Sequence, residues 1–291
     1  MKILVLGKNG MLGHVVYNYF KEQENEVYGT VYNSDGLVYD AFNNQEKLED
    51  IIKSIKPDVV INCIGILNKA AEDNKTLAVK VNSLLPHYID NLSSEYNFKF
   101  IHVSTDCVFD GKKGKYNEES YPDAISFYGR SKALGEINNN RNLTLRTSIV
   151  GPDNNPNGIG LFEWFITQNN PISGYSKVIW TGVTTIELAK CMEKAIANNL
   201  TGLHHVVNND FISKYDLLKL FAKYFNKDIE INENNNVISE KTLIKTEKSF
   251  DFKIPTYEKM IEEMKIWVQD HKELYPLIME NCSLGGKKIW K

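Results

Sequence analysis

Short apolar runs alternate along the first half of the chain with longer segments that carry apolar residues at helical spacing. The runs are rich in Val, Ile and aromatic residues and are bounded by turn residues, which predicts β-strands. These predicted strands cover residues 2–6, 26–30, 37–39, 58–63, 98–104 and 143–148. The predicted helices between them cover residues 11–23, 45–56, 75–95 and 127–140. Continuous apolar strands separated by helices predict a Rossmann-like α/β fold, a doubly wound parallel sheet with right-handed crossovers.

The pattern changes after Gly151. Residues 152–158 are rich in Pro, Asn and Gly and predict a segment that leaves the sheet. Further helices are predicted at residues 184–199, 213–225 and 257–270, a short strand at 205–207 and an Asn-rich surface loop at 232–236. We therefore expect a first domain over residues 1–150 and a smaller, mixed α/β C-terminal lobe over residues 151–291. Parts of the second half, such as residues 178–200, are expected to return to the first domain.

The composition excludes several classes of protein. A chain of 291 residues with 42% hydrophobic and 24% charged residues can bury a substantial core, so wholesale disorder is not expected. The net charge is −3 and no basic stripe stands out, which argues against a nucleic-acid partner. Every apolar run is shorter than the ~20 residues that span a bilayer. The four cysteines form no CxxC pair and the six histidines show no ligand spacing, so we expect no metal site and a reducing, cytoplasmic location.

A glycine-rich segment follows the first predicted strand and begins the first predicted helix. It reads Gly7-Lys8-Asn9-Gly10-Met11-Leu12-Gly13. Glycines at this place let the backbone turn tightly and approach the pyrophosphate of a dinucleotide at the helix N-terminus. We therefore expect residues 7–12 to bind an NAD(P) cofactor, and residues 1–150 to form its domain.

The cofactor itself is less strongly specified. The second strand ends without the acidic residue that would hold the ribose 2′-hydroxyl of NAD. Lys8, between the glycines, can reach a 2′-phosphate, which favours NADPH and leaves NADH open. Asp40, after the third strand, is a candidate for binding the adenine amino group.

Tyr128 and Lys132 lie four residues apart in a predicted helix, so the phenol and the ammonium share one face. Reduction of a carbonyl by hydride needs a proton for the oxygen, and a neighbouring cation lowers the phenol pKa from its usual value of about 10. The same spacing occurs at Tyr17/Lys21 and at Tyr215/Lys219, so the spacing alone decides nothing.

The position of Tyr128 in the fold separates it from the other two tyrosines. It follows a strand that ends in Ser104-Thr105-Asp106, at the carboxyl edge of the sheet where open α/β folds bind ligands. A hydroxyl at this edge can hold a substrate carbonyl while charge develops on its oxygen. We expect Thr105 to do so, with Ser104 as the second candidate.

Four segments carry a family resemblance. They are Gly7–Gly13, the run Ser104-Thr105-Asp106-Cys107-Val108-Phe109-Asp110-Gly111, the run Tyr128-Gly129-Arg130-Ser131-Lys132, and Arg146-Thr147-Ser148. Together they resemble the extended short-chain dehydrogenase/reductases and, within these, the dTDP-4-dehydrorhamnose reductases. The resemblance implies NAD(P)H-dependent reduction of the C4 ketone of a nucleotide-linked 4-keto-6-deoxysugar, in deoxysugar and surface polysaccharide biosynthesis, with the C-terminal lobe mainly binding this substrate.

The resemblance also implies residue roles. Tyr128 becomes the acid/base, Lys132 its activator and Thr105 the group that holds the carbonyl. Asn82 matches a family asparagine near the active site. The remaining implied positions fall beside the cofactor at Cys63, Ile64, Gly65 and Ser104, and on the substrate side at Asp106, Cys107 and Trp180.

Three positions depart from the family pattern. Cys107 and Ile149 stand where Tyr and Trp are common, and His14 stands where the rhamnose enzymes carry an acid linked to a metal at their dimer contact. We therefore carry over neither the metal nor the dimer, and a homodimer stays open. Two alternative functions also stay open. One is a sugar-nucleotide epimerase or epimerase–reductase, which needs a further acid/base pair; no obvious Cys/His pair is placed for it, but Cys107 keeps it open. The other is a non-catalytic dinucleotide-binding regulatory subunit.

Overall fold

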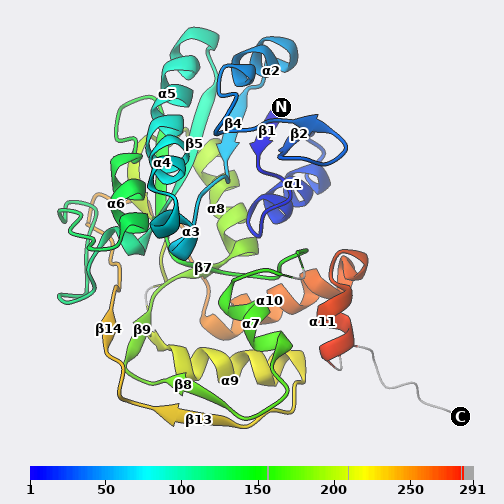
Figure 1. Ribbon diagram of the computed structural model, residues 1–291, viewed down its shortest axis with the longest axis vertical. Helices are drawn as coiled ribbons and strands as arrows, with labels where there is room; N and C mark the ends of the chain where they lie inside the picture. Colours follow the sequence, from blue (N-terminus) through cyan, green and yellow to red (C-terminus); the bar gives the residue numbers. More distant parts are fainter. Residues whose placement is uncertain (156, 209, 283, 285–291) are drawn as a thin grey trace, which may run out of the picture.

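The structure is a computed structural model that describes residues 1–155, 157–208, 210–282 and 284. Figure 1 shows a larger part at the top, built on a sheet with helices on both sides, and a smaller part below it. Helices α10 (Tyr257–Asp270) and α11 (Pro276–Asn281) lie between α1 (Gly13–Glu22) and α9 (Lys214–Phe225) in this view. None of the described helices has the length and apolar composition needed to cross a membrane.

The larger part is a parallel sheet of seven strands in the order β11-β6-β5-β4-β1-β2-β3. The strands are β1 (Lys2–Leu6), β2 (Glu26–Val31), β3 (Leu37–Val38), β4 (Val59–Asn62), β5 (Lys99–Thr105), β6 (Leu143–Thr147) and β11 (Gly202–His205). The six strands predicted for the first half are all present, with bounds that differ by one residue at most. The doubly wound α/β fold is therefore confirmed.

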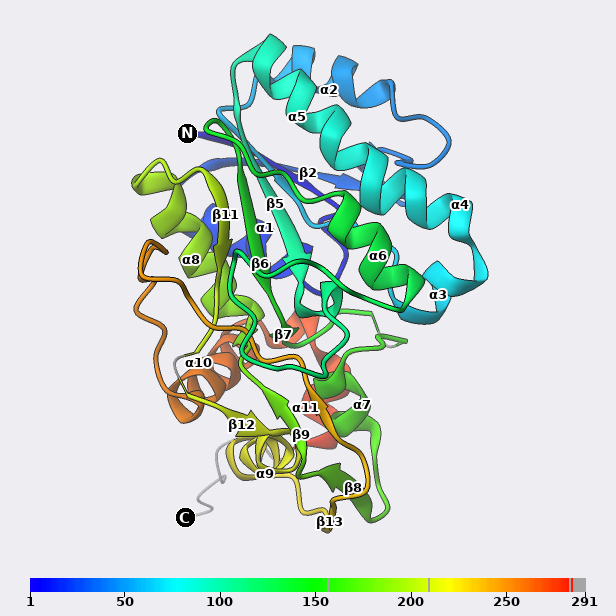
Figure 2. The same cartoon turned by 90° about the vertical axis from the view of Figure 1, so that its left-hand side faces the viewer.

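Alternating side chains of β1 divide the core into two layers. Ile3 and Val5 pack with α1 and α8 (Thr185–Ala197), whereas Leu4 and Leu6 pack with α2 (Lys47–Ile55) and α5 (Leu85–Tyr96). Figure 2 shows α5 together with α6 (Phe127–Leu134) on one side of the sheet and α8 on the other. Both faces of the sheet are covered, which explains why its strands are continuously apolar.

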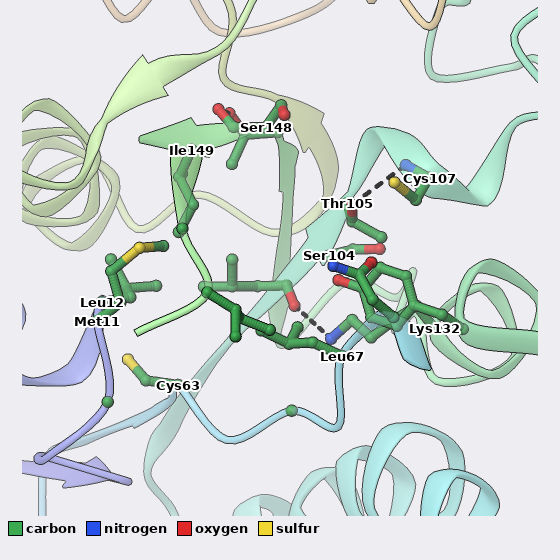
Figure 3. Close-up of a pocket in the computed structure, with 18 of the residues that line it drawn as sticks. Met11, Leu12, Cys63, Leu67, Ser104, Thr105, Cys107, Lys132, Ser148 and Ile149 are labelled. Atoms are coloured by element: carbon green, nitrogen blue, oxygen red, sulfur yellow. Dashed lines mark hydrogen bonds between the residues drawn. The ribbon is translucent and has the colours of Figure 1, made fainter. Parts of the chain in front are cut away.

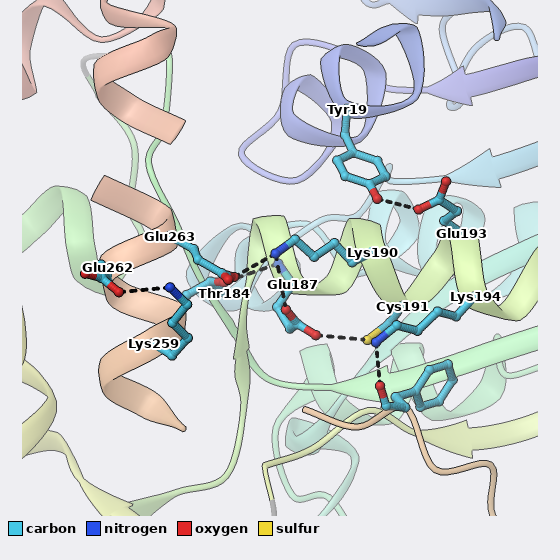
Figure 4. Close-up of polar contacts among 11 residues, drawn as sticks. Tyr19, Thr184, Glu187, Lys190, Cys191, Glu193, Lys194, Lys259, Glu262 and Glu263 are labelled. Carbon is cyan, nitrogen blue, oxygen red and sulfur yellow. Dashed lines mark hydrogen bonds and ion pairs between the residues drawn. The ribbon is translucent and has the colours of Figure 1, made fainter. Parts of the chain in front are cut away.

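Helix α8 connects the sheet to the C-terminal helices. The Tyr19 hydroxyl of α1 donates to Glu193 over 2.5 Å, and Lys190 pairs with Glu263 of α10 over 2.7 Å. Figure 4 shows these contacts on α8, together with a bond from the Lys194 ammonium to a backbone carbonyl. The second half of the chain thus returns to the first through α8 and then adds strand β11 beside β6.

The smaller part contains short strands and four helices within the described residues. Its strands are β7 (Ile149–Val150), β8 (Ile172–Tyr175), β9 (Val178–Trp180), β10 (Val183–Thr184), β12 (Ile212–Ser213), β13 (Ile231–Asn234) and β14 (Ser239–Glu240). Its helices are α7 (Leu161–Thr167), α9, α10 and α11. β9 pairs with β12 and β14, and β8 pairs with β13, so this part is a mixed α/β layer.

Three predicted elements have different bounds in the structure. The helix predicted at residues 127–140 ends at Leu134. Its C-cap, Gly135, lies against Asn82, where a Cβ would come within 2.0 Å of the Asn82 carbonyl oxygen. The strand predicted at 205–207 is β11, displaced towards the N-terminus. The Asn-rich loop predicted at 232–236 is wrong, because β13 covers Ile231–Asn234 and β8 satisfies its backbone hydrogen bonds.

The helix predicted at residues 75–95 is continuous but changes its winding. It consists of α4 (Lys75–Ala78), a π-helical turn at Val79–Leu84 and α5. A second short helix, α3 (Asn68–Asp73), precedes it. A π-turn inserts one extra residue into the helix and commonly marks a functional position.

Arg146 forms a buried ionic centre at the end of β6, where it is 2% exposed. Its guanidinium donates to Glu136 over 2.8 Å and 2.5 Å, and it lies 5.1 Å from the ring centroid of Phe109. The His205 ring of β11 donates from Nδ1 to the Ile244 carbonyl and accepts from Arg146 through Nε2 over 3.0 Å. Burial lowers the pKa of His205 to about 4, so this imidazole is neutral and able to accept.

We expect Arg146→Met to lower the free energy of unfolding by about 3–5 kcal/mol, because Glu136 then becomes a buried, unpaired charge. Lys259→Met is the control, since Lys259 and Glu262 are an exposed pair whose loss costs less than about 1 kcal/mol. Urea denaturation measures both values. Equal effects of the two substitutions would contradict a stabilising role for the Arg146 centre.

Candidate active site

Two adjoining cavities open at the carboxyl ends of the central strands. The first has a volume of about 400 Å³ and is shown in Figure 3. The second has a volume of about 550 Å³ and extends to the ends of β2 and β3. Gly10, Cys63, Ile64 and Gly65 line both cavities. The two therefore form one extended site that passes over the glycine loop.

The glycine loop has no room for side chains on its inner side. Gly7 has a φ of 80°, in the region that favours glycine, and a Cβ on Gly13 would lie 2.0 Å from the Gly7 carbonyl oxygen. The Gly10 amide donates to the same oxygen over 3.1 Å, and a Cβ at Gly10 would meet no other atom within 4 Å. The loop is thus closely packed between Gly7 and Gly13, and its Gly10 faces open space at the cavity. This arrangement fits the pyrophosphate of a dinucleotide.

The second cavity contains Asp40, as expected for a residue that contacts adenosine. Its carboxylate accepts the backbone amides of Phe42 and Asn43 over 2.9 Å and 3.0 Å. Asn9 also lines this cavity, but Lys8 lines neither. The Lys8 ammonium lies 5.1 Å from the ring centroid of Tyr17, so the structure does not bring it to the expected 2′-phosphate position.

Tyr128 and Thr105 meet in the first cavity because α6 packs directly on the turn after β5. Ser126 caps α6 by accepting the Gly129 amide over 3.1 Å. Gly129 lies against the Cys107 carbonyl, where a Cβ would come within 2.0 Å of the oxygen. The Thr105 hydroxyl accepts the Cys107 amide and donates to the Asp106 carboxylate, both over 3.1 Å. The Tyr128 phenol is thereby held beside the Thr105 hydroxyl.

Lys132 is one turn further along α6 and is also buried. Its ammonium donates to the Val103 carbonyl over 2.7 Å and lies 3.3 Å from the His102 ring. Burial lowers the pKa of Lys132 to about 8. Burial also raises the pKa of the Tyr128 phenol, and the Thr105 hydroxyl opposes this change only in part. The expected lowering of the phenol pKa by Lys132 is therefore absent here, because the ammonium is directed to β5.

Asn82 supports the site from behind and lines neither cavity. Its side chain accepts the Ile66 amide and donates to the Ile66 carbonyl, both over 2.8 Å, and it also donates to the Ser131 hydroxyl over 3.0 Å. Because Asn82 lies in the π-helical turn, this turn fixes the loop after β4 against α6. Ser104 reaches the edge of the first cavity, but its hydroxyl donates to Glu136 over 2.5 Å.

Of the three residues expected to bind the substrate, Asp106 and Cys107 line the first cavity and Trp180 does not. Trp180 is buried against Tyr257, and the Lys214 ammonium lies 4.9 Å from the centroid of its indole ring. The charge of Asp106 acts on Lys214, yet the described residues offer this ammonium no hydrogen-bond acceptor. Burial lowers the pKa of Lys214 to about 8. Sequence reasoning missed Lys214, because nothing local marks a lysine at the start of a helix.

Sequence reasoning also missed the segment that covers the first cavity from the smaller part. The residues it contributes are Ser148, Ile149, Asp153, Ile159, Gly160 and Leu161. The turn-rich composition predicted that the chain leaves the sheet here, but gave no sign that it returns over the site. Over the described ranges, no group of three or more His, Cys, Asp or Glu side chains is arranged to hold a metal ion.

The sequence resembles several curated proteins over parts of their length. It is 35% identical over 144 residues to a probable low-salt glycan biosynthesis reductase of Haloferax volcanii, covering 47% of this chain and 48% of that protein. It is 31% identical over 138 residues to methionine adenosyltransferase 2 subunit beta of Danio rerio, covering 46% and 42%. It is 30% identical over 186 residues to dTDP-4-dehydrorhamnose reductase of Aggregatibacter actinomycetemcomitans, covering 60% and 63%. The matches thus span about half the length of these relatives.

The fold is similar to solved reductase structures. A dTDP-4-dehydrorhamnose reductase from Bacillus anthracis, solved in complex with NADP, superposes with a TM-score of 0.77 and 22% identity, covering 91% of this chain and 99% of that one. A family model described as the RmlD substrate binding domain matches residues 1–264. The resemblance indicated by the sequence motifs is therefore confirmed. The chain belongs to the RmlD substrate-binding family, within the extended short-chain dehydrogenase/reductases.

Proposed function

We propose that the chain is an NADPH-dependent reductase of the C4 ketone of a nucleotide-linked 4-keto-6-deoxysugar, in deoxysugar and surface polysaccharide biosynthesis. The observation that carries this proposal is the convergence of Thr105, Tyr128 and Lys132 with the glycine loop on one cavity. The similarity to a glycan biosynthesis reductase and to a dTDP-4-dehydrorhamnose reductase supports it.

The residues that would hold the cofactor follow the extended site. The amides of the glycine loop would bind the pyrophosphate, Asp40 the adenosine, and Lys132 with residues 63–65 the nicotinamide end. NADPH bound there supplies a hydride to the carbonyl carbon. NADH could be held by the same groups. Among the described residues, no Lys or Arg lines the second cavity to bind the 2′-phosphate that distinguishes NADPH from NADH.

The chain's own residues manage the proton and the charge on the oxygen. Tyr128 is protonated at neutral pH because burial raises the pKa of its phenol, so it can donate to the oxygen as negative charge develops. Thr105 lies beside it and shares the hydrogen bonds of the same oxygen. The Lys132 ammonium adds positive charge in a water-poor cavity, where it acts more strongly than in bulk water.

Lys214 supports an anionic substrate. It is a half-buried cation with no hydrogen-bond acceptor among the described residues, and the charge of Asp106, which lines the first cavity, acts on it. A cation partly removed from water without a partner is costly, whereas a phosphate oxygen would satisfy it. We assign Lys214 to the diphosphate of the nucleotide sugar, with residues 151–291 supplying most of the substrate-binding lobe.

A second candidate function is a non-catalytic dinucleotide-binding subunit of another enzyme. The similarity to methionine adenosyltransferase 2 subunit beta favours it. The presence of Thr105, Tyr128 and Lys132 around one cavity argues for catalysis instead, since a sensor needs no proton donor. An epimerase gains no support, because burial raises the pKa of the Cys107 thiol to about 11 and keeps it protonated. The homodimer and the cytoplasmic location stay predictions.

Replacing Tyr128 with Phe removes the proton donor and keeps the ring. We expect kcat for a 4-keto sugar nucleotide to fall by about 10²-fold or more, because the hydroxyl assigned to protonate the oxygen is lost. NADPH binding should persist. Tyr215→Phe is the matched control from another Tyr-x-x-x-Lys sequence and should leave kcat unchanged. Retention of turnover in Tyr128→Phe, measured by NADPH absorbance, would refute the assignment.

The pH dependence reports on Lys132. Its pKa is lowered to about 8 in the free protein, and the ammonium is the active form, so kcat/KM should decrease as the pH rises through about 8. Lys132→Arg keeps its charge at these pH values and should abolish the decrease, even if its rate is lower. A wild-type profile that stays flat between about pH 7 and about pH 9 would contradict this role.

Lys214→Met removes the half-buried cation and keeps a long, unbranched side chain. We expect the KM for the nucleotide sugar to rise about tenfold, because one charge-assisted hydrogen bond is lost, while the Kd for NADPH stays unchanged. Lys219→Met, an exposed lysine on the same helix, is the control. Steady-state kinetics at varied concentrations of the sugar nucleotide compares the KM of the two variants. An unchanged KM in Lys214→Met would contradict the assignment of Lys214 to substrate binding.

A further inference from the structure

A chain of buried hydrogen bonds joins the C-terminal helices to the glycine loop. The indole of Trp267 on α10 contacts the hydroxyl of Tyr275 over 2.8 Å, and this hydroxyl contacts Nε2 of His14 over 2.7 Å. Nδ1 of the same ring contacts the Gly10 carbonyl over 3.0 Å. All three side chains are buried, and the central bond connects positions 261 residues apart. No local sequence signal links them.

The donor and the acceptor of each of these three hydrogen bonds can be assigned. The indole nitrogen can only donate, so the Tyr275 oxygen accepts from Trp267. The Tyr275 proton is then available for Nε2 of His14. The Gly10 carbonyl can only accept, so Nδ1 of His14 carries the ring proton. Burial lowers the pKa of His14, which keeps the ring in this neutral form.

The last bond orients a peptide group that lines the cavity. The Gly10 carbonyl accepts from the His14 ring and also from the His14 backbone amide, each over 3.0 Å. In a trans peptide the carbonyl and the next amide point in opposite directions. The Met11 amide therefore points away from the helix, at its N-terminal end, and has no acceptor in the described part of the chain. Gly10 and Met11 both line the first cavity.

We propose that Trp267, Tyr275 and His14 are positioning residues through which the C-terminal segment sets the affinity for the dinucleotide. By holding the Gly10 carbonyl, they keep the Met11 amide oriented for a pyrophosphate oxygen before the ligand arrives. The inference rests on the proposed function only in taking a dinucleotide as the ligand of the glycine loop. It assigns a binding role to His14, at the position where the sequence departs from its relatives.

Tyr275→Phe tests the chain by removing one hydroxyl while keeping the ring. We expect the Kd for NADPH, measured by fluorescence titration without any sugar, to rise about tenfold, because an unanchored His14 ring no longer fixes Gly10. The kcat at saturating NADPH should stay within about twofold of wild type, since these residues do not touch the reacting atoms. The double variant His14→Phe/Tyr275→Phe should bind NADPH as weakly as His14→Phe alone, because both changes break the same connection.

Tyr257→Phe is the matched control for loss of stability. Tyr257, the first residue of α10, is buried as Tyr275 is, and its hydroxyl donates to the Trp180 and Asp210 carbonyls over 3.1 Å and 2.9 Å. It should lower the melting temperature as Tyr275→Phe does and leave the Kd for NADPH unchanged. A wild-type Kd in Tyr275→Phe, or an equal weakening in Tyr257→Phe, would overturn the inference. Wild-type protein that binds NADPH but reduces no keto sugar would instead overturn the proposed reductase and leave this comparison valid.

Discussion

The site depends on the close contact between α6 and the turn that follows β5. Only glycine fits at position 129, because a Cβ there would come within 2.0 Å of the Cys107 carbonyl oxygen. This contact holds Tyr128 beside Thr105 and directs Lys132 along β5 towards the Val103 carbonyl. The position of the proton donor is thus a consequence of backbone packing. The catalytic groups lie on α6 and at the carboxyl end of β5, which meet at this point.

Buried polar groups on both sides of the cavity keep it in shape. Arg146, Glu136 and His205 hold the ends of β6 and β11 together, and Glu136 also accepts from Ser104 at the end of β5. His14 and Tyr275 hold the glycine loop at the other end, from the opposite side of the fold. Such groups are costly to bury and worthwhile only when every donor has an acceptor, so they specify one arrangement of the elements around the site. The half-buried Lys214 ammonium has no hydrogen-bond acceptor among the described residues, and an anionic ligand would supply one.

Much of the fold could be predicted from the sequence, because local patterns determine it. Strands β1 to β6 are short segments rich in Val, Ile, Leu and aromatic residues, and the glycine loop and the pair Tyr128/Lys132 have local signatures. The missed features depend on distant contacts. β13 carries an Asn-rich sequence with no strand signal and is ordered by β8. His14 and Tyr275 lie at opposite ends of the chain, and Lys214 is brought to Trp180 only by the packing of α9. The bond from Lys132 to Val103 likewise exists only in the folded site.

The central claim is that this cavity transfers a hydride to a sugar ketone. The most direct measurement incubates the protein with NADPH deuterated at the transferring position and a panel of dTDP-, UDP- and GDP-linked 4-keto-6-deoxysugars, and locates the deuterium by NMR. The account predicts that one member of the panel gains a single deuterium at C4. Absence of deuterium from every sugar, despite NADPH binding, would contradict a reductase. Exchange only at a carbon beside the ketone in deuterated water would contradict it as well, and would indicate an epimerase.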